Sequence, residues 1–290
     1  MIKLINGDCY KELESIPDSS VHCAILDPPY NIAGMGLDWD HKALTKSAAK
    51  ATTIKGMPVG MAFDSAQGRQ LQDFMIPVAK HIFRILIPGA FAISFSQARL
   101  YHHMAMAFEI AGFELRDMLG WTYSGQAKAF SQDHFIHRRK DLTDDEKATL
   151  IASLKDRKTP QLRPCIEPMT LAQKPKVGTY VENWIEHGVG LIDVSQKHED
   201  LFPGNLMPFP KPTKKEKGDT NFHFTVKPVA LIEHLIRLFT QPGQTVIDPF
   251  LGSGTTAVAA MLTDRCCIGI ERNIEYLEIA KQRISQIMHH

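Results

Sequence analysis

The chain has 290 residues, of which 44% are hydrophobic, and its formal net charge is +1. This length and composition exclude a disordered chain and predict one large α/β domain with an insertion, or two smaller domains that share a core. Because the net charge is close to zero, any contact with nucleic acid must come from local clusters of charge.

The first 123 residues alternate short apolar runs with amphipathic segments. Strands are predicted at 3–7, 21–26, 90–95 and 114–123, and helices at 11–16, 70–87 and 98–111. Residues 31–61 are rich in Gly, Ala, Ser, Thr and Lys and keep neither period, which predicts a mobile loop. Alternation of this kind indicates an α/β fold with a doubly wound, mostly parallel sheet.

The pattern changes between residues 124 and 221. Basic clusters such as 137–140 alternate there with acidic clusters such as 144–146, and prolines recur, so we expect an inserted module of irregular fold. Regular structure then returns, with helices at 228–239, 255–262 and 275–287 and strands at 245–248 and 266–271. The chain is therefore predicted to form one domain from two halves, 1–123 and 222–290, with the module 124–221 between them.

The turn Asp27-Pro28-Pro29-Tyr30 follows the apolar run 21–26, where a buried strand should end. Ligands of open α/β sheets lie beyond the carboxyl ends of the strands, and consecutive prolines leave carbonyl groups free to accept hydrogen bonds. A carboxylate and a proline carbonyl can hold the two hydrogens of an amino group while an aromatic ring stacks on a planar base. The alternative is an ordinary strand-ending turn, because Asp and Pro are common there.

A second turn, DPFLGSGTT, joins the strand 245–248 to the helix 255–262. Its glycines allow the backbone to approach a ligand at a helix N-terminus, and Glu271 ends the next strand nineteen positions after Gly252. An acid at that place binds ribose hydroxyls in Rossmann-like sheets, which indicates a nucleoside-bearing cofactor. The carboxylate of Asp248 would repel a pyrophosphate but not the cationic S-adenosylmethionine, and no G-K-[ST] of a P-loop follows the glycines. The alternative is a turn that serves only helix–strand packing.

Together the two turns resemble those of the β-class amino-group DNA methyltransferases, in which the catalytic half precedes the cofactor half. The resemblance rests on NGDCYKELESIPDSSVHCAILDPPYN (6–31), HFTVKPVALIEHLIRLFTQPGQTVIDPFLGSGTTAVAA (223–260) and IGIERNIEYLEIAKQRI (268–284). The stretch EPMTLAQKPKVGTYVENWIEHGVG (167–190) is similar to the middle of phage- and prophage-associated members. Phe224 stands where the family usually has a proline.

The resemblance implies a Rossmann-like S-adenosylmethionine-dependent fold, no metal, and a role for each matching residue. The target base is handled by Asp27, Pro28 and Tyr30, with Pro29 in the same turn. The implied cofactor contacts are Asp8 near the adenine, Lys227 near the methionine carboxylate, Glu271 on the ribose, and Asp248, Phe250, Gly252, Gly254 and Thr255 around the methionine end, with Pro249 and Ser253 in the same turn.

The predicted reaction is site-specific transfer of a methyl group to N6 of a flipped-out adenine in double-stranded DNA. Adenine is favoured because family members with Asp at the head of the tetrad mostly modify adenine, whereas Ser there is commoner for cytosine N4. The alternatives are cytosine N4, an idle DNA-binding or partner-dependent modification subunit, and a transferase for RNA or a protein glutamine amide. The module 124–221 is expected to read the target sequence.

Cellular location and partners follow from weaker signals. Five scattered cysteines without a C-x-x-C pair disfavour a disulfide framework and a zinc site and fit a reducing cytoplasm. The N-terminus lacks a signal-peptide pattern, and no apolar run approaches membrane-spanning length, so we expect a cytoplasmic protein without a membrane partner. A cognate restriction endonuclease and a monomeric or homodimeric state stay open.

Overall fold

One mostly parallel sheet forms the centre of the protein in a computed structural model, which describes residues 1–29, 66–125, 129–197, 201–213, 216 and 226–288. In this described part eight strands pair in the order β1 (Ile2–Asn6), β8 (Cys266–Glu271), β7 (Thr245–Asp248), β2 (Val21–Leu26), β3 (Leu86–Phe95), β5 (Ile166–Gln173), β4 (Glu114–Thr122) and β6 (Leu206–Met207). The strands from β1 to β3 are parallel, β5 is antiparallel to both of its neighbours, and β6 is parallel to β4. The predicted doubly wound α/β fold is confirmed.

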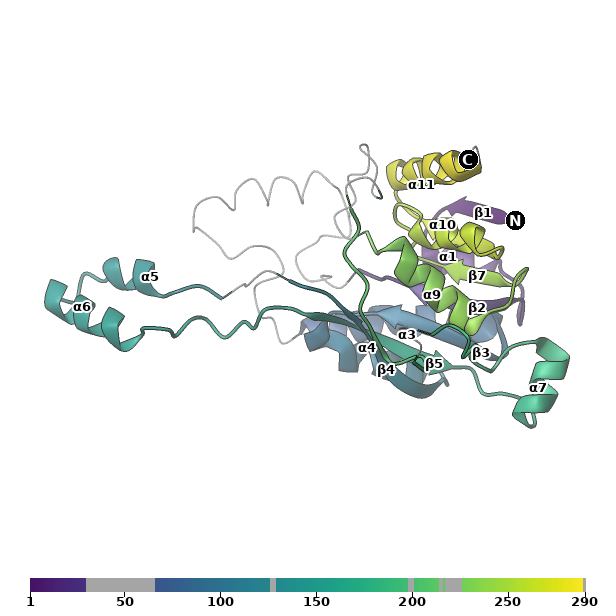
Figure 1. Ribbon diagram of the computed structural model, residues 1–290, viewed down its shortest axis with the longest axis horizontal. Coiled ribbons are helices and arrows are strands. Elements are labelled where there is room, and N and C mark those ends of the chain that lie inside the picture. The colour runs from purple at the N-terminus through teal and green to yellow at the C-terminus, as the bar shows by residue number, and fades with distance from the viewer. Residues whose placement is uncertain (30–65, 126–128, 198–200, 214–215, 217–225, 289–290) are drawn as a thin grey trace.

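Helices cover both faces of this sheet (Figure 1). One face packs against α1 (Cys9–Glu14), α3 (Gln67–Ile85) and α4 (Tyr101–Ile110), which follows the short η2 (Ala98–Leu100), and the other against α9 (Val229–Phe239), α10 (Thr255–Leu262) and α11 (Ile274–Met288). Alternate residues of β2 supply the two cores, because Cys23 and Ile25 join the α9–α11 side while Ala24 and Leu26 join the other. Among the described helices none is long and apolar enough to cross a membrane.

The strand β3 begins at Leu86, earlier than the sequence predicts, and runs through the Pro88-Gly89 pair. Its register against β2 shifts between the pairs Val21↔Leu86 and Cys23↔Phe91. Gly89 has a φ of 84°, which L-residues rarely adopt. The pair therefore forms a bulge inside the strand and does not separate the predicted helix 70–87 from the predicted strand 90–95.

The segment 124–221 differs from the predicted module of irregular fold. β5 lies inside it and pairs with both β3 and β4, so this segment contributes a strand to the central sheet. Thr170 and Gln173 interrupt the apolar pattern of β5 and are nevertheless buried, which explains why the sequence pattern predicts no strand there. An arm between β4 and β5 projects from the sheet and carries α5 (Asp133–His137) and α6 (Asp144–Ser153) near its far end (Figure 1).

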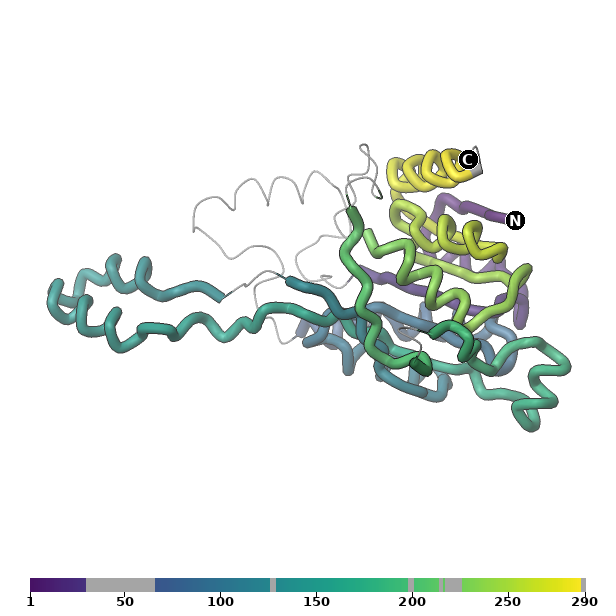
Figure 2. The backbone as a smooth tube through the Cα atoms, in the orientation of Figure 1, coloured from purple at the N-terminus to yellow at the C-terminus, as the bar shows by residue number. Residues whose placement is uncertain are grey.

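The two legs of this arm run side by side (Figure 2). At the root, Tyr123 N donates to Cys165 O at 3.0 Å. Further out, Phe130 N donates to Thr159 Oγ1 and Thr159 N donates to Phe130 O, both at 3.1 Å. Because α6 begins with a complete capping box formed by Thr143 and Glu146, the arm has its own defined secondary structure.

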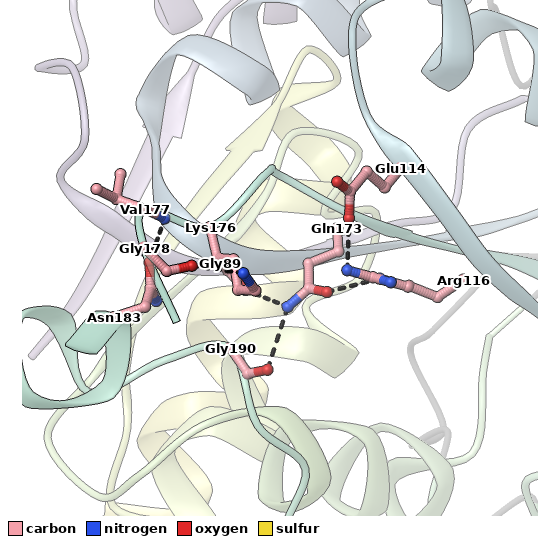
Figure 3. Close-up of polar contacts among 9 residues, drawn as sticks. All are labelled: Gly89, Glu114, Arg116, Gln173, Lys176, Val177, Gly178, Asn183 and Gly190. Carbon is pink, nitrogen blue, oxygen red and sulfur yellow. Dashed lines mark hydrogen bonds and ion pairs between the residues drawn. The ribbon is translucent and has the colours of Figure 1, made fainter. Parts of the chain in front are cut away.

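At the opposite end of β5, Gln173 anchors the chain around α7 (Tyr180–His187) to the sheet (Figure 3). Its Nε2 donates to Gly89 O at 2.8 Å and to Gly190 O at 3.2 Å, and its Oε1 accepts from Arg116 Nε at 2.7 Å. Asn183 Nδ2 makes a similar bond to Pro88 O at 3.1 Å. Buried amides whose hydrogen bonds are satisfied in this way fix the geometry of a loop.

Candidate active site

The two predicted turns lie next to each other at the carboxyl edge of the sheet. Asp27 directly follows β2, and Asp248 ends β7, which pairs with β2 through Ala24 and Ile247. Glu271 ends β8, the next strand beyond β7. The sheet topology therefore brings together acids that are far apart in the sequence, as is typical of ligand sites in open α/β sheets.

The Asp27 carboxylate is held by a buried lysine. Lys227 Nζ lies 2.6 Å from Asp27 Oδ2 and 3.1 Å from Glu167 Oε1, and it stands over the ring of Phe95 at 4.9 Å. Burial alone would lower the pKa of Lys227, but the charges of the two carboxylates outweigh burial and raise it. The three side chains therefore form a bridge of two carboxylates and one ammonium group.

The prolines of the first turn end β2, since neither can donate a hydrogen bond to a neighbouring strand. Pro28 is buried and Pro29 is half-buried. Tyr30 lies outside the described residues, so its stacking on a base stays a prediction.

Glycines shape the second turn. Gly252 and Gly254 have φ values of 55° and 87°. A Cβ atom on Gly254 would lie 2.6 Å from Ala280 Cβ, so the turn packs directly on α11 and leads at once into α10 at Thr255. Only glycine fits this combination of left-handed backbone and close contact.

Asp248 is a buried acid that is held by neutral donors. Its Oδ2 accepts from Thr256 Oγ1 at 2.5 Å and its Oδ1 accepts from Phe250 N at 2.9 Å. Burial raises the pKa of Asp248 to about 7, and the charges of Asp27 and Glu271 add to the shift. A cation near this turn would therefore be stabilised as Asp248 ionises.

Glu271 lies against the glycine turn. Its Oε2 accepts from Gly252 N and its Oε1 from Asn273 N, both at 2.7 Å. Burial raises the pKa of Glu271, although these backbone donors oppose the shift. Each carboxylate oxygen has a second lone pair, which can accept a hydrogen bond from a ribose hydroxyl.

The other predicted residues also have structural partners. Asp8 caps α1 by accepting from Tyr10 N at 3.0 Å. The ring of Phe74 lies 5.5 Å from that of Tyr10 and 6.0 Å from that of Phe250, so aromatic contacts connect the start of α1 with the second turn. Pro249 lies within this turn, between Asp248 and Phe250.

Sequence reasoning assigned no role to two charged residues of the site. Arg283 on α11 donates to Ser253 O at 2.7 Å and lies 3.2 Å from Thr255 Oγ1, so it fixes the glycine turn. Glu167 on β5 is the second carboxylate on Lys227. The sequence signal for both was only their place inside stretches similar to the methyltransferase family.

The second turn fits a cationic nucleoside ligand such as S-adenosylmethionine. The glycines give close access to the backbone, Glu271 offers acceptors for a ribose, and Asp248 offers a negative charge. Within the described ranges, no group of three or more His, Cys, Asp or Glu side chains could hold a metal ion.

Comparisons with known proteins agree with this geometry. Residues 21–282 match the DNA methylase family of N6 and N4 methyltransferases. The Type II methyltransferase M.HindIII of Haemophilus influenzae is 31% identical, in a match that covers 97% of this chain and 94% of the relative. The Type II methyltransferase M2.DpnII of Streptococcus pneumoniae is 25% identical over 97% and 88%.

Two solved structures share the fold. The match to the M1.HpyAVI–SAM complex covers 98% of this chain and 99% of the chain in that structure, with a TM-score of 0.58 at 21% identity. The cytosine-N4-specific PvuII DNA methyltransferase covers 97% and 86%, with a TM-score of 0.63 at 17% identity.

The chain belongs to the family of N6/N4 amino-group DNA methyltransferases. It is an S-adenosylmethionine-dependent enzyme of DNA methylation. The resemblance of 167–190 to phage-associated members stays a prediction.

Proposed function

We propose that the chain methylates N6 of adenine at a specific sequence in duplex DNA. The observation that carries this proposal is the Asp27 carboxylate, which heads the DPPY turn and is held by Lys227 at the edge of the cofactor turn. Among members of the family, Asp at this place is the commoner choice for adenine. Cytosine N4 is the second candidate, because the PvuII enzyme with the same fold is cytosine-N4-specific.

The proposed mechanism depends on orientation. The target base must leave the duplex, at a cost of a few kcal/mol, and Tyr30 offers a face on which it stacks. Asp27 and the carbonyl of Pro28 then accept the two amino hydrogens, which turns the nitrogen lone pair out of conjugation with the ring.

S-adenosylmethionine, when bound, would supply the methyl group for the amino lone pair, and the electrons of its S–C bond would stay on the departing thioether sulfur. The methylated nitrogen loses one proton, which Asp27 passes to solvent. Contacts to the cofactor are assigned as predicted, with Glu271 on the ribose, Asp248 near the sulfonium and ammonium groups, and Asp8 near the adenine.

We assign target recognition to the segment 124–221, and within it chiefly to the arm. The arm leaves the sheet where β4 ends and β5 begins, and Glu167 of β5 reaches the same lysine as Asp27. An extension rooted at the base site is well placed to contact flanking DNA, where base contacts give specificity. Exchange of the segment for that of a relative should change the sequence methylated without changing the base. An active chimera that still marks the original sequence would contradict this assignment.

The proposed cellular setting is the cytoplasm, with a restriction endonuclease as the partner activity. The names of the relatives as Type II methyltransferases support this pairing.

Single-molecule sequencing of DNA from cells with and without the gene tests the proposed function. We expect N6-methyladenine at one sequence motif, present only with the gene and absent with a D27A variant. N4-methylcytosine instead would establish the second candidate. Unmodified DNA in cells that contain folded protein would contradict both.

A further inference from the structure

Three elements contribute one residue each to the bridge at the base site. Asp27 comes from the end of β2, Glu167 from the start of β5, and Lys227 from the segment before α9. The side chain of Lys227 is only 7% exposed, whereas those of Asp27 and Glu167 are 20% and 17% exposed. The ammonium group is thus enclosed, and both carboxylates keep a side that a ligand can reach.

The bridge holds the carboxylate of Asp27. Lys227 Nζ donates to Oδ2 at 2.6 Å, so the carboxylate is tied through this oxygen to the buried ammonium group. An ammonium group has three donors and no acceptor, and here two carboxylates and the face of Phe95 surround it. Such a group is confined by its partners, and it in turn fixes the plane of the Asp27 carboxylate.

We propose that Lys227 and Glu167 are positioning residues for methyl transfer: Glu167 holds Lys227, and Lys227 fixes the Asp27 carboxylate in the orientation that accepts an amino hydrogen of the target base. The inference rests on the proposed function and deepens it. It assigns Lys227 a task at the base in place of the predicted contact with the methionine carboxylate.

Electrostatics supports this assignment. The groups that act on the bridge are Asp248 from β7 and Tyr123, whose pKa is raised by burial and further by the charge of Glu167. Among the residues that the structure describes, the charged groups that act on Asp27 include Glu167, Asp248 and Lys227. Without the ammonium group, Asp27 would face Glu167 without the positive charge that Lys227 supplies, and protonation of the pair would become more favourable. A protonated Asp27 is a poorer acceptor for the amino hydrogens.

The test compares pH profiles of kcat for the full-length wild type and for K227M, E167Q and the double variant on the duplex motif found by sequencing. K227M should lower kcat by about 100-fold at pH 7, as expected when a reacting group is misplaced. As the pH is lowered, activity is lost when Asp27 becomes protonated. The midpoint of this loss should lie about one pH unit higher in K227M than in the wild type, and about one pH unit lower in E167Q. In the double variant the profile should move back toward that of the wild type.

Two further readouts separate positioning from other roles. The dissociation constant for S-adenosylmethionine should change by less than about threefold in each variant, since the effect lies in kcat. K227R should recover part of the activity because it restores the charge. If K227M does not fold, the downward shift of E167Q still tests the inference.

Equal loss of kcat at every pH, or a large loss of cofactor affinity with an unchanged pH profile, would overturn the proposal. An inactive wild-type enzyme would instead mean that the proposed function is wrong.

Discussion

The carboxylates of the two acidic turns are stabilised in different ways. At the base turn, Asp27 and Glu167 share a buried lysine, so the protein itself supplies the countercharge. At the cofactor turn, the hydrogen bonds to Asp248 and Glu271 come from neutral donors. The pKa of both of these acids is raised, with burial as the main cause. The difference suits a first turn that must present a fixed acceptor and a second turn whose ligand brings positive charge.

The largest effect is expected from Asp27→Ala, because this change removes the acceptor for the amino group and leaves the cofactor turn intact. Turnover on duplex DNA should fall by about 10³-fold or more. Asp73→Ala, on the exposed side of α3, is the control and should keep its turnover. Steady-state kinetics with labelled S-adenosylmethionine measures both. Wild-type turnover in D27A would remove the first turn from the mechanism.

A smaller but still large effect is expected from Gly254→Ala. The matched control is Gly243→Ala, because Gly243 has nearly the same φ, 82° against 87°, but open space where a Cβ would be. Both changes should cost about 1–2 kcal/mol of folding stability through the left-handed backbone. Only G254A should also weaken cofactor binding, since its Cβ would push the turn away from Ala280. Equal cofactor affinities of the two variants would contradict the account of the turn.

Cofactor affinity should depend on pH through Asp248. The pKa of Asp248 is about 7 in the free protein, and a bound cation favours its ionised form. Affinity should therefore rise by up to about tenfold between pH 6 and pH 8, with proton release on binding. The folding stability of the free protein should depend on pH in the opposite direction. It should decrease from about pH 4 to pH 7, because the folded state holds the Asp248 proton more tightly than the unfolded state.

Calorimetry in buffers of different ionisation enthalpy measures both the affinity and the released proton. Asp248→Asn should bind S-adenosylmethionine more weakly and with a flat pH profile. An unchanged pH dependence in this variant would assign the titration to another group.

The smallest effect is expected from the arm. Neutralising Arg138, Arg139 and Lys140 together should weaken binding to all duplexes alike, and each lost phosphate contact should reduce the salt slope by about 0.9. Arg139 already pairs with Asp141, so it should contribute least. The control replaces Lys11 and Lys80, which are exposed outside the arm, and should leave the salt dependence unchanged. Loss of binding to only one sequence would indicate base contacts instead.

Local signals explain which parts of the fold and the site the sequence could predict. The strands β2 and β7 are short apolar runs with an Asp-Pro pair at their carboxyl ends, and this pattern is visible without knowledge of the fold. The bridge at the base site depends on a contact between residues 200 positions apart, which no local pattern encodes. For the same reason β5 was missed, because its polar residues are buried only through its place between two strands.

The central claim is that the first turn serves the base and the second serves the cofactor. Calorimetric titration of S-adenosylmethionine into wild type, D27A and E271A tests this claim, with E275A on the exposed side of α11 as the control. D27A and E275A should bind with nearly wild-type affinity, and E271A should lose about 1–3 kcal/mol, the value of a hydrogen bond to a charged group. Cofactor binding that is lost in D27A and kept in E271A would contradict the account.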